Sequence, residues 1–247
     1  MSISSVILTK NEEKNIGDCL RSLSFCDEVL VIDDGSWDKT VSVAEKYGGK
    51  VFQRALNGDF STQRNFGIDK ARGEWILFVD ADERISKNLG SEIIETVSKE
   101  TNFSGFYIVR RDVLWGREMR YGEVGNIKLL RLAKRDSGKW RGKVHEEWRI
   151  SGKIGSLVHP LIHYPHQTVE EFLKDINFYT DIRAKELNMQ DIPVYWSSII
   201  IYPVAKFAQN YFFKLGFLDG IPGLLIAILM SFHSFLVRSK LWQLQKK

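Results

Sequence analysis

The feature that most constrains this chain is the regular alternation of short apolar runs with amphipathic segments over residues 1–100. Runs rich in β-branched residues predict strands, and apolar residues spaced by three and four predict helices. We expect strands at Ile3–Leu8, Glu28–Ile32, Lys50–Gln53 and Trp75–Val79, and helices at Glu12–Leu23, Asp38–Tyr47, Ser61–Ala71 and Asn88–Lys99. Such alternation implies parallel strands joined by right-handed crossovers, and hence an open α/β sheet that binds ligands at the carboxyl ends of its strands.

The pattern changes after residue 100. Strands are predicted at Phe103–Arg110, Val124–Leu132 and Ile154–Tyr164, and a helix at 168–189 that opens with a capping box from Thr168 to Glu171. A mostly parallel half (1–100) and a mixed half (101–190) therefore form one α/β domain, and residues 191–247 form a helical tail.

The net charge of +4 is too small to indicate a nucleic-acid partner, and we expect none. The charge is unevenly distributed, because residues 195–247 hold six basic residues and one acid, which leaves −1 for residues 1–194. No signal-peptide pattern precedes the first strand, and the two cysteines, Cys19 and Cys26, do not require an oxidising compartment. We therefore expect a cytosolic body with a basic tail.

The tail contains two charge-free stretches, Ile192–Ala205 and Gly220–Val237. A bilayer core needs about 20 apolar residues, so the first stretch is too short to span it and the second is marginal. Between them Lys206, Asn210 and Lys214 form a polar stripe at helical spacing. This pattern favours a helix in the plane of the membrane interface, with basic residues toward anionic lipid, over residues 195–240. A core helix, an oligomer interface and a single span are the alternatives.

Acidic and polar clusters follow three of the strands. Asp80 and Asp82, one residue apart at a strand end, have the form that Mg²⁺ or Mn²⁺ needs when it bridges a diphosphate. Asp33 and Asp34 can accept hydrogen bonds from ribose hydroxyls or from a base N–H, and Gly35 permits a tight turn. Ordinary helix N-caps are the alternative for any one cluster. The three clusters are Thr9-Lys10-Asn11-Glu12, Asp33-Asp34-Gly35-Ser36 and Asp80-Ala81-Asp82-Glu83.

Two further segments carry candidate chemistry. Arg64 and Asn65 lie near the start of the helix before the Asp80 strand, and Arg64 suits a diphosphate or an acidic neighbour. In the segment 139–148, Glu146 can deprotonate a sugar hydroxyl, while Trp140 and Trp148 either stack on sugar faces or pack inside a half-buried strand. His159, His163 and His166 lie close together, but their spacing fits no zinc motif.

With these motifs the sequence resembles the family 2 inverting glycosyltransferases, which have the nucleotide-sugar-binding GT-A fold. The matching elements, in the order of the family, are Thr9-Lys10-Asn11-Glu12, Asp33-Asp34-Gly35-Ser36, Arg64-Asn65-Phe66-Gly67 and Asp80-Ala81-Asp82. The segments 140–146 and 216–224 resemble a narrower branch that includes bacterial lipopolysaccharide-core β-glucosyltransferases. The resemblance thus extends over nearly the whole chain.

The resemblance implies a role for each matching residue. A UDP-sugar donor would be bound by Thr9, Asn11, Glu12, Asp33, Asp34, Gly35, Arg64, Asn65, Asp80 and Ala81, and one Mg²⁺ or Mn²⁺ by Asp82 with Asp80. Because the chain has neither the Glu-Asp catalytic pair nor the Gln-x-x-Arg-Trp motif, the base is assigned to Glu146, with Glu147 and His145 beside it, and a processive synthase is disfavoured. Trp140, Arg141 and Trp148 would contact the acceptor.

The expected function is transfer of a hexose, expected to be glucose, from a UDP-sugar to a lipid-linked envelope glycan such as lipopolysaccharide core, at the cytoplasmic face of the inner membrane. One alternative is a polyprenyl-phosphate glycosyltransferase, whose nucleophile needs no base. The other is a non-catalytic, membrane-bound nucleotide-binding scaffold. A nucleotidyltransferase and an NAD-binding domain are disfavoured, since no Gly-rich basic loop and no GxGxxG follows the first strand.

Overall fold

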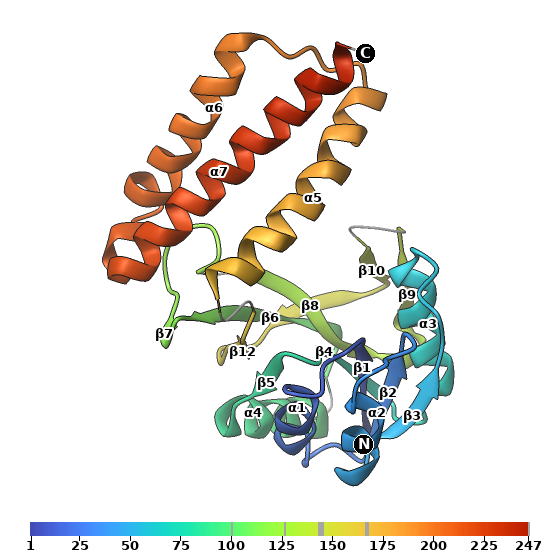
Figure 1. Ribbon diagram of the computed structural model, residues 1–247. Coiled ribbons are helices and arrows are strands. Elements are labelled where there is room, and N and C mark those ends of the chain that lie inside the picture. The colour runs from blue at the N-terminus through green and yellow to red at the C-terminus, as the bar shows by residue number, and fades with distance from the viewer. Residues whose placement is uncertain (100, 126, 143–145, 166–167, 247) are drawn as a thin grey trace. The chain divides into compact units, whose positions relative to one another are not determined.

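The computed structural model describes residues 1–99, 101–125, 127–142, 146–165 and 168–246 (Figure 1). The chain forms two compact units. One comprises Met1–Arg110 and Lys128–His163, and the other Arg111–Ile127 and Tyr164–Lys247. Each unit has its own apolar core, so each is held together by its own contacts.

The first unit is built on a mixed, mostly parallel sheet, as predicted. Its strands are ordered β3-β2-β1-β4-β8-β6-β12-β5, and β8 is antiparallel to β4. The strands are β1 (Ile3–Thr9), β2 (Glu28–Asp33), β3 (Lys50–Gln53), β4 (Trp75–Asp80), β5 (Glu83–Ile85), β6 (Phe103–Leu114), β8 (Ile127–Lys134), β11 (Lys153–Ser156) and β12 (Leu161–His163). A separate hairpin pairs β9 (Gly138–Arg141) with β10 (Glu147–Ile150) after a 3-10 turn at Arg135–Ser137.

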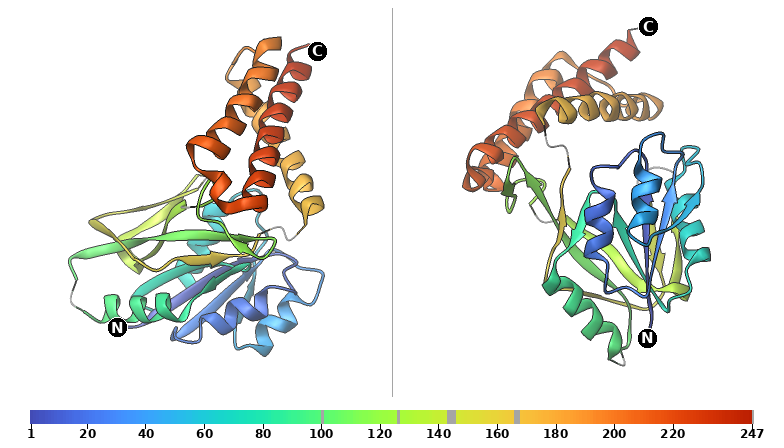
Figure 2. Two further views of the ribbon diagram at one scale, coloured as in Figure 1. Left: turned by 90° about the vertical axis from the view of Figure 1, so that its left-hand side faces the viewer. Right: turned by 60° about the horizontal axis from the view of Figure 1, so that its bottom comes forward.

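Helices cover both faces of this sheet because successive strand residues point to opposite sides. Ile7, Val31 and Leu77 pack in one cluster with residues of α1, α2 and α4. Val6 and Phe78 pack in the opposite cluster with α3 and the β9–β10 hairpin. The helices are α1 (Ile16–Ser22), α2 (Thr40–Lys46), α3 (Phe60–Lys70) and α4 (Lys87–Ser98), seen from two further directions in Figure 2.

Two predicted elements differ from the structure. The first helix begins at Ile16 and not at Glu12. Asn11 has a positive φ of 56°, and the N–H groups of Asn11 and Glu12 donate to Ser36 and to Thr40 at the start of α2, so tertiary contacts shape the chain before the helix. The strand predicted at 154–164 is two strands, β11 and β12. Pro160 lies between them, and a proline has no N–H to donate to a sheet.

The second unit contains three long helices, α5 (Val169–Met189), α6 (Trp196–Ala208) and α7 (Gly220–Gln245). In Figure 1 α7 lies between α6 and α5, and it contacts both of them. Thr168 and Glu171 form the predicted capping box of α5. By its contacts α5 joins α6 and α7, although the sequence pattern placed it in the half 101–190. The predicted boundary at residue 190, between a transferase domain and a membrane-associating tail, stays a prediction.

The connection from α6 to α7 is irregular and polar inside. A π-helical turn at Gln209–Phe213 and a 3-10 turn at Gly216–Asp219 join the two helices. The buried Asp219 carboxylate accepts the N–H groups of Arg120 (3.0 Å) and Tyr121 (2.9 Å), in the segment after the short strand β7 (Arg117–Glu118). Asp219 therefore ties the Gly216–Gly220 segment to the rest of its own unit.

One stretch of the second unit, Gly216–Gln245, is long and apolar enough to cross a membrane, and 28% of its most apolar window is buried within the protein. The polar stripe of the tail was predicted to point its basic residues toward anionic lipid, but Lys206 and Asn210 point into the unit, and only Lys214 is exposed. Lys206 Nζ lies 2.8 Å from a carboxylate oxygen of Glu123, and Asn210 Nδ2 lies 3.2 Å from the other. Lys206 Nζ and Asn210 Nδ2 are thus paired inside the unit, whereas the described residues offer the buried Oδ1 of Asn210 no hydrogen-bond partner.

Candidate active site

The three strand-end clusters meet at one edge of the sheet, as the parallel pattern predicted. β1 is the middle strand, with β2 on one side and β4 on the other. In register, Thr9 pairs with Asp33 and Leu8 with Asp80. The hydroxyl oxygen of Thr9 is buried at this edge, and the described residues offer it no hydrogen-bond partner. The carboxyl edge therefore gathers the predicted polar residues into one place.

Of the two acids after β2, only one is available to a ligand. Asp33 is fully buried and accepts hydrogen bonds from the N–H and hydroxyl groups of Ser36, so its carboxylate holds the turn. Gly35 has φ +69°, a conformation that favours glycine, and the space beside it is open. The prediction that the Asp33 side chain contacts the nucleoside is corrected in this respect, because the carboxylate supports the loop.

Asp34 lies toward the edge with a partly open carboxylate. It accepts hydrogen bonds from Lys10 Nζ at 2.7 Å and from the Leu56 N–H at 2.6 Å. Burial alone would raise the pKa of Asp34, but these two donors outweigh it and lower the pKa. The contact of this ionised acceptor with a ribose or base stays a prediction. Asn11 helps to set the loop, since its Oδ1 accepts the Trp37 N–H.

Asp80 lies between two arginines. Arg64 Nη2 is 3.3 Å from its Oδ1, and Arg131 Nη2 is 2.6 Å from its Oδ2. Burial would raise the pKa of Asp80, but the charges of Arg131 and Arg64 hold it well below its usual range. Both oxygens are therefore occupied, and Asp80 is better described as an anchor for the two arginines than as a metal ligand.

The sequence reasoning missed Arg131. Its side chain is buried and also reaches Glu83, at 2.9 Å, whose pKa burial raises. The sequence does contain a signal for Arg131, because an arginine inside the apolar run Leu129–Leu132 must find an acidic partner when the strand is buried.

Asp82 is the acid that best fits a metal. His163 Nε2 lies 3.1 Å from Asp82 Oδ2 and is the one hydrogen-bond partner that the described residues give this carboxylate. Burial raises the pKa of Glu12, and the negative charge of the nearby Asp82 raises it further. No group of three or more acidic, His or Cys residues within the described ranges could by itself hold a metal. A carboxylate and an imidazole leave the remaining positions of a divalent cation to diphosphate oxygens and water.

Arg64 joins this edge to the second candidate segment. Its Nε lies 3.0 Å from Glu146 Oε1, and its guanidinium lies 4.6 Å from the centre of the Trp140 ring. Glu146 is mostly buried, whereas Glu147 is exposed and pairs with Arg149 at 3.3 Å. The structure thus separates the two candidate bases. The remaining candidates of the sequence, His145 and His166, lie outside the described residues.

The two tryptophans are nearly buried, so the structure favours the buried-strand alternative over sugar stacking, although both contribute to the lining of the cavity beside Glu146. Trp140 and Trp148 are 8% and 5% exposed, stack on each other at 5.5 Å and contact the edge of Phe78. They form the core beneath the β9–β10 hairpin, because the hairpin covers the same face of the sheet as α3. Asn65 holds this hairpin in place, since its amide donates to and accepts from the Trp140 backbone, at 2.9 Å each.

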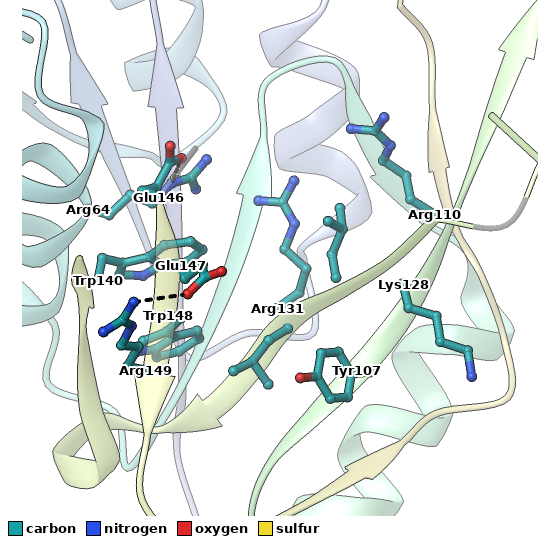
Figure 3. A pocket seen from close by; sticks show the side chains of 12 residues that line it. Arg64, Tyr107, Arg110, Lys128, Arg131, Trp140, Glu146, Glu147, Trp148 and Arg149 are labelled. Atoms are coloured by element: carbon teal, nitrogen blue, oxygen red, sulfur yellow. Dashed lines mark hydrogen bonds and ion pairs between the residues drawn. The ribbon is translucent and has the colours of Figure 1, made fainter. Parts of the chain in front are cut away.

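A cavity of about 550 Å³ opens beside Glu146 (Figure 3). This volume is in the range of small-molecule sites. The cavity lies within the first unit, between β6, β8 and the hairpin. Its described lining includes five cations, Arg64, Arg110, Lys128, Arg131 and Arg149. Arg141 is exposed and does not belong to the lining, and Ala81 is buried under the edge.

Comparison with known proteins agrees with this geometry. Over 250 residues the chain is 26% identical to the lipopolysaccharide core biosynthesis glycosyltransferase LpsC of Rhizobium meliloti, covering 98% of this chain and 93% of that protein. An uncharacterized glycosyltransferase of Rickettsia bellii is 28% identical over 256 residues, covering 98% of this chain and 86% of that protein.

Among solved structures, residues 1–349 of Staphylococcus aureus TarS in complex with UDP-GlcNAc superimpose with a TM-score of 0.50 at 16% identity, covering 100% of this chain and 92% of that one. This likeness shows the GT-A-like fold that the sequence predicted. Residues 4–149, more than half of the chain, match the family described as glycosyl transferase family 2. The chain therefore belongs to glycosyl transferase family 2.

Proposed function

We propose that this glycosyltransferase transfers a hexose from a UDP-sugar to a hydroxyl of a lipid-linked envelope glycan, with inversion of the anomeric centre. The expected hexose is glucose. The observation that carries the proposal is the contact of Arg64 with both Asp80 and Glu146. One guanidinium thereby connects the acidic edge, where a nucleoside diphosphate would leave, to the acid that would activate the acceptor.

The carboxyl edge provides the donor site. Asp34 would accept from the nucleoside, and the orphaned Thr9 hydroxyl faces the same edge. Asp82 with His163 would hold a divalent cation, which neutralises the diphosphate charge that develops as the nucleotide departs. Arg64 and Arg131, which both contact Asp80, add fixed positive charge next to that position.

Glu146 is the proposed general base. It lines the cavity in which an acceptor would bind, and the Arg64 contact fixes the direction of its side chain. The base takes the hydroxyl proton as the oxygen attacks the anomeric carbon from the side opposite the nucleotide, so that the configuration inverts. Glu147, exposed and paired with Arg149, is the weaker candidate.

The helical unit supports an acceptor in a membrane. LpsC is named for lipopolysaccharide core biosynthesis, and a core glycan is lipid-linked. Ile200, Ile201 and Val204 of α6 are 58%, 60% and 64% exposed, and α7 carries further exposed apolar residues. Such a surface is costly in water and is stabilised by lipid. We place this apolar surface at the cytoplasmic face of the inner membrane. Burial of apolar side chains, and not basic charge, would contribute most of the membrane affinity, since Lys206 and Lys240 pair within the unit.

The test is a screen of UDP-, GDP- and dTDP-hexoses for hydrolysis and for thermal stabilisation of the full chain, with Mn²⁺, with Mg²⁺ and with EDTA. We expect UDP-sugars to respond, glucose best among them, and the response to disappear with EDTA. Absence of a response to every sugar nucleotide would contradict the donor site, and an undiminished response in EDTA would contradict the cation.

A polyprenyl-phosphate acceptor is the second candidate, and the cations of the cavity favour it. A phosphate is already an anion and needs no base, so the two candidates differ in their demand for Glu146.

A further inference from the structure

We propose that Asn65 is a positioning residue for the reaction, which holds the β9–β10 hairpin against α3 so that Glu146 stays in place as the base. The inference rests on the proposed function, because it requires that Glu146 takes the proton of the acceptor. It goes beyond that function in giving Asn65 a role other than the nucleotide contact that the sequence predicts. Asn65 does not belong to the described lining of the cavity, so this role acts through the hairpin.

The hairpin needs an attachment outside itself. β9 and β10 form a sheet of two strands, separate from the main sheet, and a two-stranded hairpin is marginally stable on its own. Trp140 and Trp148 pack beneath it on Phe78, but apolar contact is non-directional and does not by itself fix the position of a strand. The position of the hairpin therefore depends on directional contacts as well.

Asn65 supplies two such contacts at one point of β9. Its Nδ2 donates to the carbonyl oxygen of Trp140, and its Oδ1 accepts the Trp140 N–H, at 2.9 Å each. The amide thus pairs with both backbone groups of Trp140, as a residue of a neighbouring strand would. Because α3 also packs against β9 (Figure 1), these two bonds prevent the strand from sliding along the helix.

The register of the hairpin carries this attachment to the base. Arg141 in β9 pairs with Glu147 in β10, and Glu146 is the residue before Glu147. Arg64, the neighbour of Asn65 in α3, holds the Glu146 carboxylate at 3.0 Å. Two consecutive residues of one helix therefore hold the base, Arg64 by its side chain and Asn65 by the backbone of its hairpin. A displacement of about 1 Å can cost about 10²-fold in rate, so the hairpin must stay in place.

The test measures hydrolysis of UDP-glucose with Mn²⁺, in which water takes the place of the acceptor hydroxyl, and calorimetric titration of UDP, both on the full chain. Asn65→Ala should lower kcat by about 10–100-fold, while the KM for UDP-glucose and the UDP affinity stay within about twofold. A side chain that contacts the nucleotide would instead contribute to UDP binding. UDP affinity that is weaker by more than about fivefold would therefore contradict the proposal.

A double-variant cycle with Glu146→Gln separates a positioning role from a general loss of structure. If Asn65 acts through Glu146, Asn65→Ala should lower kcat by less than about twofold in the Glu146→Gln background. The same fold-loss in both backgrounds, or an unchanged kcat in Asn65→Ala alone, would overturn the proposal. Asn65→Asp keeps the size of the side chain but places a carboxylate oxygen against the Trp140 carbonyl. It should show the same cycle, and it takes the place of Asn65→Ala if that variant does not fold.

Ser4→Ala is the matched control for stability. Ser4 is fully buried near the amino end of β1, where its hydroxyl donates to Glu28 Oε1 at 2.6 Å and accepts the Gly73 N–H at 2.7 Å. Like Asn65→Ala it removes two hydrogen bonds, so both variants should lower the melting temperature by about 2–6 °C. Ser4→Ala should nevertheless keep the wild-type kcat. An equal loss of kcat in the two variants would show that Asn65 acts through stability alone and would refute the positioning role.

The rates also distinguish failure of this inference from failure of the proposed function. If wild type hydrolyses neither UDP-glucose nor any other UDP-hexose, or if Glu146→Gln keeps the wild-type kcat, the proposed function fails. If Glu146→Gln lowers kcat and the Asn65 variants do not follow the cycle, only this inference fails.

Discussion

The Nε atom of Arg64 lies 3.0 Å from Oε1 of Glu146, although the two residues are 82 positions apart in the sequence. Arg64 lies in the second turn of α3 on one side of the site, and Glu146 directly precedes β10 on the other. Because the same guanidinium contacts Asp80, the position of the proposed base depends on the strand that ends at the acidic edge.

Replacing Glu146 with Gln tests the base directly. The amide keeps the shape of the side chain but cannot take a proton, so we expect turnover to fall by about 10²–10⁴-fold while UDP affinity stays within about twofold. Steady-state transfer and calorimetric UDP titration measure the two quantities. Glu147→Gln is the matched control and should leave turnover near wild type. Unchanged turnover in Glu146→Gln would remove the base and favour a phosphate nucleophile.

Arg64→Ala should cost stability as well as activity. The substitution leaves the Glu146 carboxylate mostly buried without its ion partner and uncovers a face of Trp140, so we expect the free energy of unfolding to fall by about 3 kcal/mol. Urea denaturation measures it. Arg21→Ala, which removes an exposed ion pair with Asp18, should change it by less than about 1 kcal/mol. Equal effects of the two substitutions would contradict the structural role of Arg64.

The sheet edge could be predicted from sequence because it depends on local rules. Each strand is an apolar run that ends in polar residues, and parallel strands bring those ends together. The elements whose observed bounds differ from the predicted ones are those whose ends depend on tertiary contacts. The N–H groups of Asn11 and Glu12 donate to Ser36 and to Thr40 at the start of α2, and no periodicity of the first helix reveals these contacts.

The candidate site was predictable only in part, for the same reason. Asp34, Asp82 and Arg64 stand in recognisable motifs, but the pairing of Arg131 with Asp80 and of His163 with Asp82 joins residues 51 and 81 positions apart. Trp140 and Trp148 show the limit most clearly. Their spacing was compatible with a sugar platform and with a buried strand, and the packing against Phe78 favours the core.

Asp82→Asn tests the cation. Loss of a charged ligand predicts UDP affinity in Mn²⁺ about tenfold to a hundredfold weaker, with no change in the affinity measured in EDTA. Titration calorimetry in both buffers separates the two. Asp136→Asn, at an exposed turn, is the control and should behave as wild type. If Asp82→Asn changes neither UDP affinity nor activity, the scaffold alternative gains and the metal assignment is lost.

The pH dependence of stability should show the charge of Asp80. Its folded-state pKa is held below the unfolded value, so its contribution is fully present above the unfolded pKa and is lost as pH falls below about 4. Urea denaturation of wild type and Asp80→Asn should therefore differ most above pH 5. The difference should shrink by at most about 1.4 kcal/mol per pH unit below pH 4. A difference that is constant down to pH 2 would contradict the ion pairs with Arg131 and Arg64.

Membrane binding should depend on the exposed apolar face of α6. Ile200 and Val204 are one helical turn apart, so both lie on one face, and Ile200→Asp with Val204→Asp should weaken binding to phosphatidylcholine vesicles by at least about tenfold. Co-sedimentation of the full chain measures it. Val158→Asp is the matched control, since Val158 is 83% exposed but belongs to the first unit, and it should bind as wild type.

Because Lys206 and Lys240 pair with Glu123 and Asp181, added anionic lipid should strengthen membrane binding only slightly. For the same reason 0.5 M salt, which gives a screening length of about 4 Å, should weaken membrane binding only slightly. Strong dependence on salt together with unchanged binding of the α6 variant would show that charge, and not the apolar face, holds the protein at the membrane.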